Sequence, residues 1–178
     1  MRSAVLDLSG SVGDPDVARE ALVRFNLYQE NPVALHPDLR AVVYGLLGRQ
    51  GNRATYDAIW ELEKKAVIHE EKMRLLGGLA CFEQKDLLQE TLERSLGSEV
   101  RSQDTVMILI AIAANRHGRD LAWDFIKENW AELDRRYGSG GFAIMRLVAT
   151  TGTFTTLERA QEVEEFFAGH PAPSASRT

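Results

Sequence analysis

The sequence predicts an all-α protein of two-helix repeats, HEAT-like or armadillo-like, that stack into a curved superhelix. Apolar residues recur at helical spacing along most of the 178-residue chain, and no segment sustains the alternation of a half-buried strand. The expected helices alternate in character, because an amphipathic helix is followed each time by a more apolar one. The first helices of the pairs begin near residues 14, 52, 83, 118 and 155, and this period of roughly 31 to 38 residues is typical of helical solenoids.

Capping residues and apolar stripes together predict nine helices. These cover about residues 14–29, 36–47, 52–66, 70–80, 83–96, 102–117, 119–137, 142–149 and 155–167. Asp14, followed by Pro15, is the expected N-cap of the first helix, and Asn52 is that of the third. The segment Thr155-Thr156-Leu157-Glu158 has the pattern of a capping box at the start of the last helix.

The block from Val100 to Leu133 predicts a helical hairpin with a short Arg-His-Gly turn. Its first helix is almost wholly apolar, so we expect it to be buried on most sides, although the run Val106–Ile112 is compatible with a strand on periodicity alone. The second helix carries Trp123 and Trp130, which share one face because they are seven residues apart. We expect these tryptophans to pack between helices, and a ligand groove is the alternative.

Three segments are expected along the chain. Residues 1–13 are predicted to be disordered or a linker, residues 14–169 to form the helical-repeat domain, and residues 170–178 to be a coil tail. The first and last repeats lack the polar outer faces that end a solenoid. We therefore expect this domain to be a truncated part of a longer polypeptide.

Composition and charge argue against several classes of function. The net charge is −5, and basic residues are not clustered as binding to nucleic acid or to an anionic membrane surface requires. Apolar runs are too short for a membrane helix, and the first residues do not have the pattern of a signal peptide. Cys81 is the single cysteine, which excludes an intramolecular disulfide and is consistent with a cytoplasmic location.

A search for catalytic groups finds no complete motif. The nearest approach to a zinc-binding H-E-x-x-H helix is His69-Glu70-Glu71-Lys72-Met73, in which Met73 replaces the second histidine. Cys81 lies in an apolar setting without a neighbouring histidine, which favours a buried structural thiol over a reactive one. The turn Gly138–Gly141 lacks the lysine that follows a phosphate loop, so we expect it to join two helices. We expect neither catalytic residues nor a bound metal in this chain.

Charged residues are expected mainly on solvated helix faces. An acidic run of this kind comprises Glu61, Glu63, Glu70 and Glu71. Two interpretations stay open for the polar start of the helix near residue 102. Either Ser102 caps the helix, or Arg101 faces a cavity and holds a carboxylate.

Three segments resemble the C-terminal helical domain of the puromycin-sensitive aminopeptidase family. The members of this family are zinc aminopeptidases of the gluzincin type. The segments are VR-x-QDT at 100–105, AANRHGR-x-LAW-x-FIKENW-x-EL at 113–133 and FF-x-x-HPAPSA at 166–175. Weaker similarity at 38–44 and 70–72 extends the resemblance over nearly the whole chain after Asp14.

The resemblance implies a non-catalytic domain of a cytosolic enzyme that removes N-terminal residues from peptides. In that family the domain is a HEAT-like superhelix that curves over a separate catalytic domain and walls a cavity that admits peptides. The zinc ion and its ligands belong to the catalytic domain, so no catalytic or metal-binding residue carries over to this chain. The implied partners are the peptide substrate and the catalytic domain of the same polypeptide.

A free-standing helical-repeat scaffold that binds a protein or peptide in its concave groove is the alternative function. On either hypothesis, the second helices of the repeats are expected to line the concave face. Arginines on or beside these helices are candidates to bind a peptide carboxylate, and structural ion pairs are their alternative role. They are Arg40, Arg74, Arg101 and Arg146.

Overall fold

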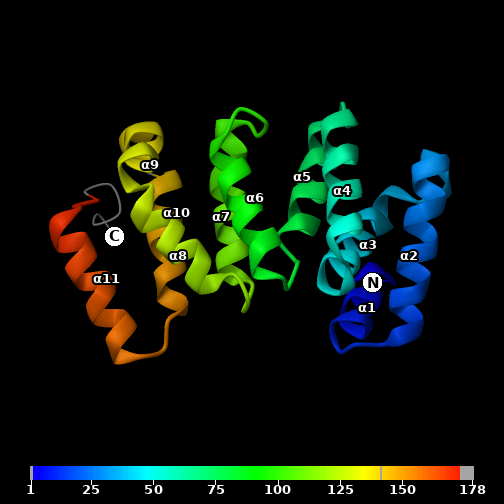
Figure 1. The fold of residues 1–178 in the computed structure, drawn as a ribbon, viewed down its shortest axis with the longest axis horizontal. Helices are drawn as coiled ribbons and strands as arrows, with labels where there is room; N and C mark the ends of the chain where they lie inside the picture. Colours follow the sequence, from blue (N-terminus) through cyan, green and yellow to red (C-terminus); the bar gives the residue numbers. More distant parts are fainter. Residues whose placement is uncertain (1, 141, 173–178) are drawn as a thin grey trace. The chain divides into compact units, whose positions relative to one another are not determined.

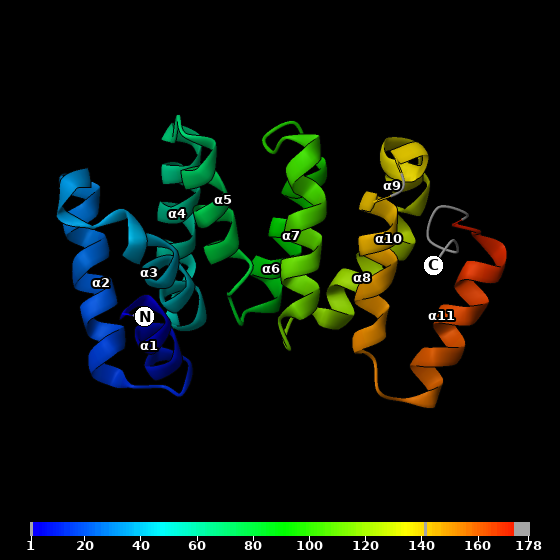
Figure 2. The same ribbon diagram turned by 180° about the vertical axis from the view of Figure 1, so that it is seen from behind.

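The computed structural model describes residues 2–140 and 142–172, and within them the chain is all-helical, as predicted (Figures 1 and 2). The α-helices are α1 (Arg2–Ser11), α2 (Pro15–Glu30), α3 (Pro37–Gln50), α4 (Arg53–Lys65), α5 (His69–Leu79), α6 (Lys85–Leu96), α7 (Ser102–Ala114), α8 (Arg119–Glu128), α9 (Trp130–Tyr137), α10 (Phe142–Ala149) and α11 (Leu157–Gly169). Short 3-10 helices are η1 (Pro32–Ala34), η2 (Gly138–Gly140) and η3 (Thr150–Thr153). The chain divides within α6 into two compact units, the first ending at Thr91 and the second beginning at Leu92.

In the first unit, α3 is the central helix. It packs against α1, α2 and α5, and α4 packs in turn against α5 (Figure 1). Tyr44 of α3 is fully buried and meets Phe25 and Tyr28 of α2 edge-on, with ring centroids 6.2 Å apart in both pairs. Edge-on aromatic pairs of this kind combine a large buried area with a favourable ring geometry, so they fix α2 on α3.

In the second unit, α7 packs against α8 and α10, and α9 packs against α10. Trp123 of α8 and Trp130 of α9 are both buried. The Trp123 ring lies 5.3 Å from that of Phe166, and the Trp130 ring lies 5.3 Å from that of Phe167, both in α11. The prediction that the two tryptophans pack between helices is therefore confirmed, and α7 shows that the run Val106–Ile112 is helical.

Local capping explains where several helices begin. Asp14 accepts hydrogen bonds from two backbone N–H groups in the first turn of α2, and Asn52 accepts one in α4, so both predicted N-caps are confirmed. The predicted capping box at Thr155 is displaced by one residue. Thr156 is the N-cap of α11 and accepts from the backbone N–H of Arg159, so a glutamate does not stand at the third helical position.

The structure corrects the expectation that residues 1–13 are disordered or a linker, because residues 2–11 form α1. An isolated helix of this length is marginal in water, so its stability has to come from tertiary packing. Asp7 pairs with Arg49 of α3 at 3.0 Å, and Gly10 lies so close to Leu46 that a Cβ atom would overlap that side chain. At the other end, residues 170–172 of the predicted coil tail are non-helical, and residues 173–178 lie outside the described part.

Two predicted helices are shorter than expected because asparagine side chains interrupt them. The expected helix over 119–137 is divided at Asn129 into α8 and α9. The Asn129 side chain donates to the Phe125 carbonyl at 2.9 Å, a local bond that competes with regular helical geometry. The helix predicted for 102–117 ends at Ala114, because Asn115 is extended and its side chain accepts from the His117 N–H.

Glycines allow α3 and α5 to approach each other closely. A Cβ atom on Gly48 would lie 2.3 Å from the Gly78 carbonyl oxygen, and one on Gly78 would lie 2.7 Å from the Cβ atom of Tyr44. Neither distance is sterically possible, so any side chain there would force the two helices apart. The neighbouring Gly77 faces open space, with nothing within 4 Å of its Cβ position.

We predict that Gly78→Ala lowers the free energy of unfolding by about 1 to 3 kcal/mol, because the added methyl group overpacks the contact between α3 and α5. Gly77→Ala is the matched control. It should leave the stability unchanged or raise it by about 0.5 to 1 kcal/mol, because alanine is the better helix former. Urea denaturation followed by circular dichroism measures both changes. If both substitutions changed the free energy of unfolding equally, the close contact between α3 and α5 would not be the cause of the effect.

Candidate functional site

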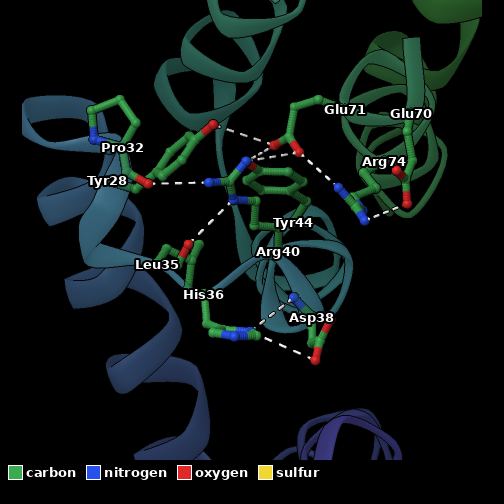
Figure 3. A network of polar contacts seen from close by, with 10 residues as sticks. All are labelled: Tyr28, Pro32, Leu35, His36, Asp38, Arg40, Tyr44, Glu70, Glu71 and Arg74. Carbon is green, nitrogen blue, oxygen red and sulfur yellow. Dashed lines mark hydrogen bonds and ion pairs between the residues drawn. The ribbon is translucent and has the colours of Figure 1, made fainter. Parts of the chain in front are cut away.

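A buried carboxylate, that of Glu71 in α5, is the centre of a polar network in the first unit (Figure 3). Oε2 accepts from Arg40 Nη1 at 3.1 Å and from Arg74 Nη1 at 3.0 Å. Oε1 accepts from the hydroxyl of Tyr44 at 2.6 Å and from that of Tyr28 at 3.3 Å. These five residues, which we call the Glu71 network, come from α2, α3 and α5, so the network joins three helices.

Arg40 also holds the turn that precedes α3. Its Nε atom donates to the Leu35 carbonyl at 3.2 Å, and its Nη2 atom donates to the Pro32 carbonyl at 3.1 Å (Figure 3). The guanidinium group lies over the Tyr28 ring, 4.8 Å from its centroid. Each of the three guanidinium nitrogens is therefore engaged within the chain, and one arginine connects η1, α3 and α5.

The electrostatics of the network keep Glu71 ionised. Burial acts to raise the pKa of Glu71, but hydrogen bonds from Tyr44, Arg40 and Arg74 outweigh it, so the pKa lies below the ordinary value. Burial and the hydrogen bond to Glu71 raise the pKa of Tyr44, so its phenol stays protonated and donates. The network thus holds one anion between two cations, and this arrangement fixes helices rather than transferring protons.

Within the acidic run, Glu61 and Glu70 are exposed as expected, but the structure corrects the expectation of a solvated face for the other two residues. Glu63 and Glu71 are buried, with 3% and 6% of their surfaces exposed. Glu63 pairs with Lys72 Nζ at 2.9 Å, and Glu71 accepts the hydrogen bonds of the Glu71 network. The sequence pattern did not predict these roles. The four-residue spacing of Arg40 and Tyr44 on α3 is nevertheless a signal for them, because it places both donors on one helix face.

The four predicted arginines occupy different settings. Arg40 and Arg74 both pair with the Glu71 carboxylate. They therefore form structural ion pairs, which was the alternative role expected for them. Arg101 is exposed at the N-cap position of α7, and Arg146 is exposed on α10. Neither guanidinium makes an ion pair with any residue in the part of the chain that the structure describes. Whether any of the four binds a peptide stays a prediction.

The expected cap at Ser102 is wrong, because Ser102 is the first residue of α7 and Arg101 occupies the N-cap position without a side-chain cap bond. The Ser102 hydroxyl instead lies 3.1 Å from that of Tyr137. Cys81 is half-buried, and its thiol donates to the Gly77 carbonyl at 3.3 Å. Burial raises the pKa of Cys81, which agrees with an unreactive thiol.

Residues 2–140 and 142–172 contain neither a cluster of metal ligands nor a helix suited to cross a membrane. There, no three histidine, cysteine, aspartate or glutamate side chains gather in a way that could hold a metal ion. The zinc ion that the resemblance implies therefore finds no fitting ligand set among these residues. In the same ranges, no helix combines the length and apolar character that a membrane crossing requires.

Comparisons with known proteins place the chain in a family. The family model described as "ERAP1-like C-terminal domain" matches residues 1–178, and the chain belongs to that family. Aminopeptidase M1 of Arabidopsis thaliana is 32% identical over 100% of this chain and 21% of its own length. Aminopeptidase M1-B of Oryza sativa subsp. japonica is 34% identical over 99% of the chain and 21% of its own length. Human aminopeptidase N is 33% identical over 88% of the chain and 16% of its own length.

The chain thus spans about a fifth of the length of the first two of these relatives. The resemblance to the C-terminal helical domain of an aminopeptidase is confirmed by the family match. The particular member that the sequence segments resemble, the puromycin-sensitive enzyme, stays a prediction.

We predict that Glu71→Gln lowers the free energy of unfolding by about 3 kcal/mol, because two arginines lose the charge that compensates them in a buried site. Glu70→Gln is the matched control, since Glu70 also pairs with Arg74 but its side chain is 72% exposed. Its effect should stay below about 1 kcal/mol. Urea denaturation at neutral pH measures both. A small effect of both substitutions would contradict a central role for Glu71.

The difference in stability between wild type and Glu71→Gln should also depend on pH. The pKa of Glu71 in the folded chain lies below its ordinary value of 4.5, so the ionised carboxylate contributes its full stability above that value. This contribution is lost as the pH falls through the lower, folded-state pKa. Urea titrations from about pH 7 to about pH 3 should show a constant difference at first and a shrinking one in acid. A difference that grows in acid would contradict the assignment.

Proposed function

We propose that this chain is the non-catalytic C-terminal helical domain of a cytosolic zinc aminopeptidase, and that it walls the cavity in which the peptide substrate binds. The observation that carries the proposal is the family match over residues 1–178, in a chain that spans about a fifth of Aminopeptidase M1. The zinc ion and the reacting groups would then belong to the catalytic domain of the same polypeptide.

The exposed side chains of the second unit support a peptide-binding role. Met107 of α7 and Phe142 of α10 are exposed apolar residues, and Arg101 and Arg146 add cations without an internal partner within the described chain. Apolar contacts combined with a few fixed charges are the usual means by which a surface holds an extended peptide. The HEAT-like superhelical stacking is part of the same proposal, because stacked repeats provide a concave surface.

We predict that the 178-residue chain binds a fluorescently labelled decapeptide and does not shorten it, with or without added zinc. Fluorescence anisotropy measures binding, and mass spectrometry measures hydrolysis. Arg101→Ala should weaken binding about threefold, since an exposed charge contributes modestly. Arg135→Ala is the control, because Arg135 is equally on the surface but already pairs with Glu132. Chelator-sensitive hydrolysis would overturn the non-catalytic assignment, and a peptide that fails to bind would overturn the role in substrate binding.

A further inference from the structure

The same three-residue sequence occurs in two helices of this chain. It is Met73-Arg74-Leu75 in α5 and Met145-Arg146-Leu147 in α10. In both, the leucine is buried with 1% of its surface exposed, and the methionine is half-buried. The two arginines therefore hold the same position relative to the core of their own unit, one in the first unit and one in the second.

The helical turn that precedes each copy of this sequence determines whether the arginine has an ion-pair partner on its own helix. In α5 that turn supplies Glu70 and Glu71, and Arg74 binds both, at 2.6 and 3.0 Å. In α10 the corresponding positions, three and four residues before Arg146, are Ala143 and Phe142. Arg146 consequently has no carboxylate in reach on its own helix, and it makes no ion pair within residues 2–140 and 142–172. The positive charge of Arg146 therefore lacks the paired carboxylates that neutralise the charge of Arg74.

Arg146 stands beside a groove of about 270 Å³ in the second unit, open to solvent. The lining residues are small or aliphatic and come from α7, α10 and η3: Ile110, Ala113, Ala114, Ala149, Thr150 and Thr153. The hydroxyls of Thr150 and Thr153 donate to the Leu147 and Thr150 carbonyls, so they already satisfy backbone groups at the end of α10. The guanidinium of Arg146 is thus the charged group of the groove.

We propose that this groove binds a glutamate side chain of a peptide held by the domain, with Arg146 pairing the carboxylate. This rests on the proposed function and adds a preference in the peptide to it. The alanines leave room for the slender methylene stem of glutamate, and a planar guanidinium can pair both carboxylate oxygens. The groove is open, so a continuous peptide can cross it, which favours a side chain over a chain end.

The test uses C-terminally amidated decapeptides, with one glutamate moved along the sequence and a glutamine peptide matched to each. At low salt, the best glutamate peptide should bind the 178-residue chain about fivefold more tightly than its glutamine partner. Arg146→Ala should abolish this preference. Phe142→Glu should abolish it too, because a glutamate four residues before Arg146 repeats the pairing of Glu70 with Arg74. Phe142→Gln is the matched control. It removes the same ring without adding a charge, so it should weaken binding of the glutamate and glutamine peptides alike and keep the preference between them.

Arg146 and Phe142 are both exposed, so circular dichroism should show the same thermal unfolding for wild type and all three variants. Equal binding of every glutamate and glutamine pair overturns the glutamate site and leaves the proposed function standing. A preference that survives Arg146→Ala also overturns it. So does a preference that is absent from the amidated decapeptides and appears only when the same peptides are tested with a free C-terminal carboxylate. If no peptide binds at all, both the site and the proposed function are wrong.

Discussion

The first unit depends on the compensation of one buried charge. An ionised carboxylate in a protein interior is stable only if hydrogen bonds and opposite charges replace the lost water. Glu71 meets that condition with donors from three helices, and Arg40 extends the same set of bonds to the turn at Pro32 and Leu35. The positions of α2, η1, α3 and α5 are therefore coupled. The close contact at Gly48 and Gly78 is compatible with this coupling, because it brings α5 near the donors on α3.

Aromatic packing attaches the last helix, α11, to α8 and α9 in the second unit. Trp123 and Trp130 contact the two phenylalanines of α11, and a polar contact at the edge supports them. There, Glu162 of α11 accepts from the Trp123 indole at 3.2 Å and pairs with Lys127. The bond from Lys127 lowers the pKa of Glu162 to about 2, so this carboxylate stays ionised at any physiological pH. The last helix is thus fixed by rings that bury a large area and by one charge at their border.

Arginines in this family domain illustrate how a local sequence acquires a role from its neighbours. Arg74 and Arg146 lie in the same three-residue sequence, yet two preceding glutamates make the first a structural residue. Without such glutamates, the second is exposed and has no ion pair among the described residues. Arg40 and Arg101 differ in the same way. Arg40 donates to carbonyl groups of the turn before α3, whereas Arg101 makes no ion pair within the described chain.

The sequence by itself determined the helical class, most helix positions, the caps at Asp14 and Asn52, and the family resemblance. The helical class, the helix positions and the caps follow from apolar spacing and from side chains within a few residues of the backbone they cap. The resemblance rests instead on the segments at 100–105, 113–133 and 166–175. The tertiary structure alone decided that Glu71 is buried, that residues 2–11 form α1, and which arginines are occupied. Tyr28 and Glu71 are separated by 43 residues, and Asp7 and Arg49 by 42. Periodicity describes one helix at a time, so it cannot show which distant side chains will meet when helices pack.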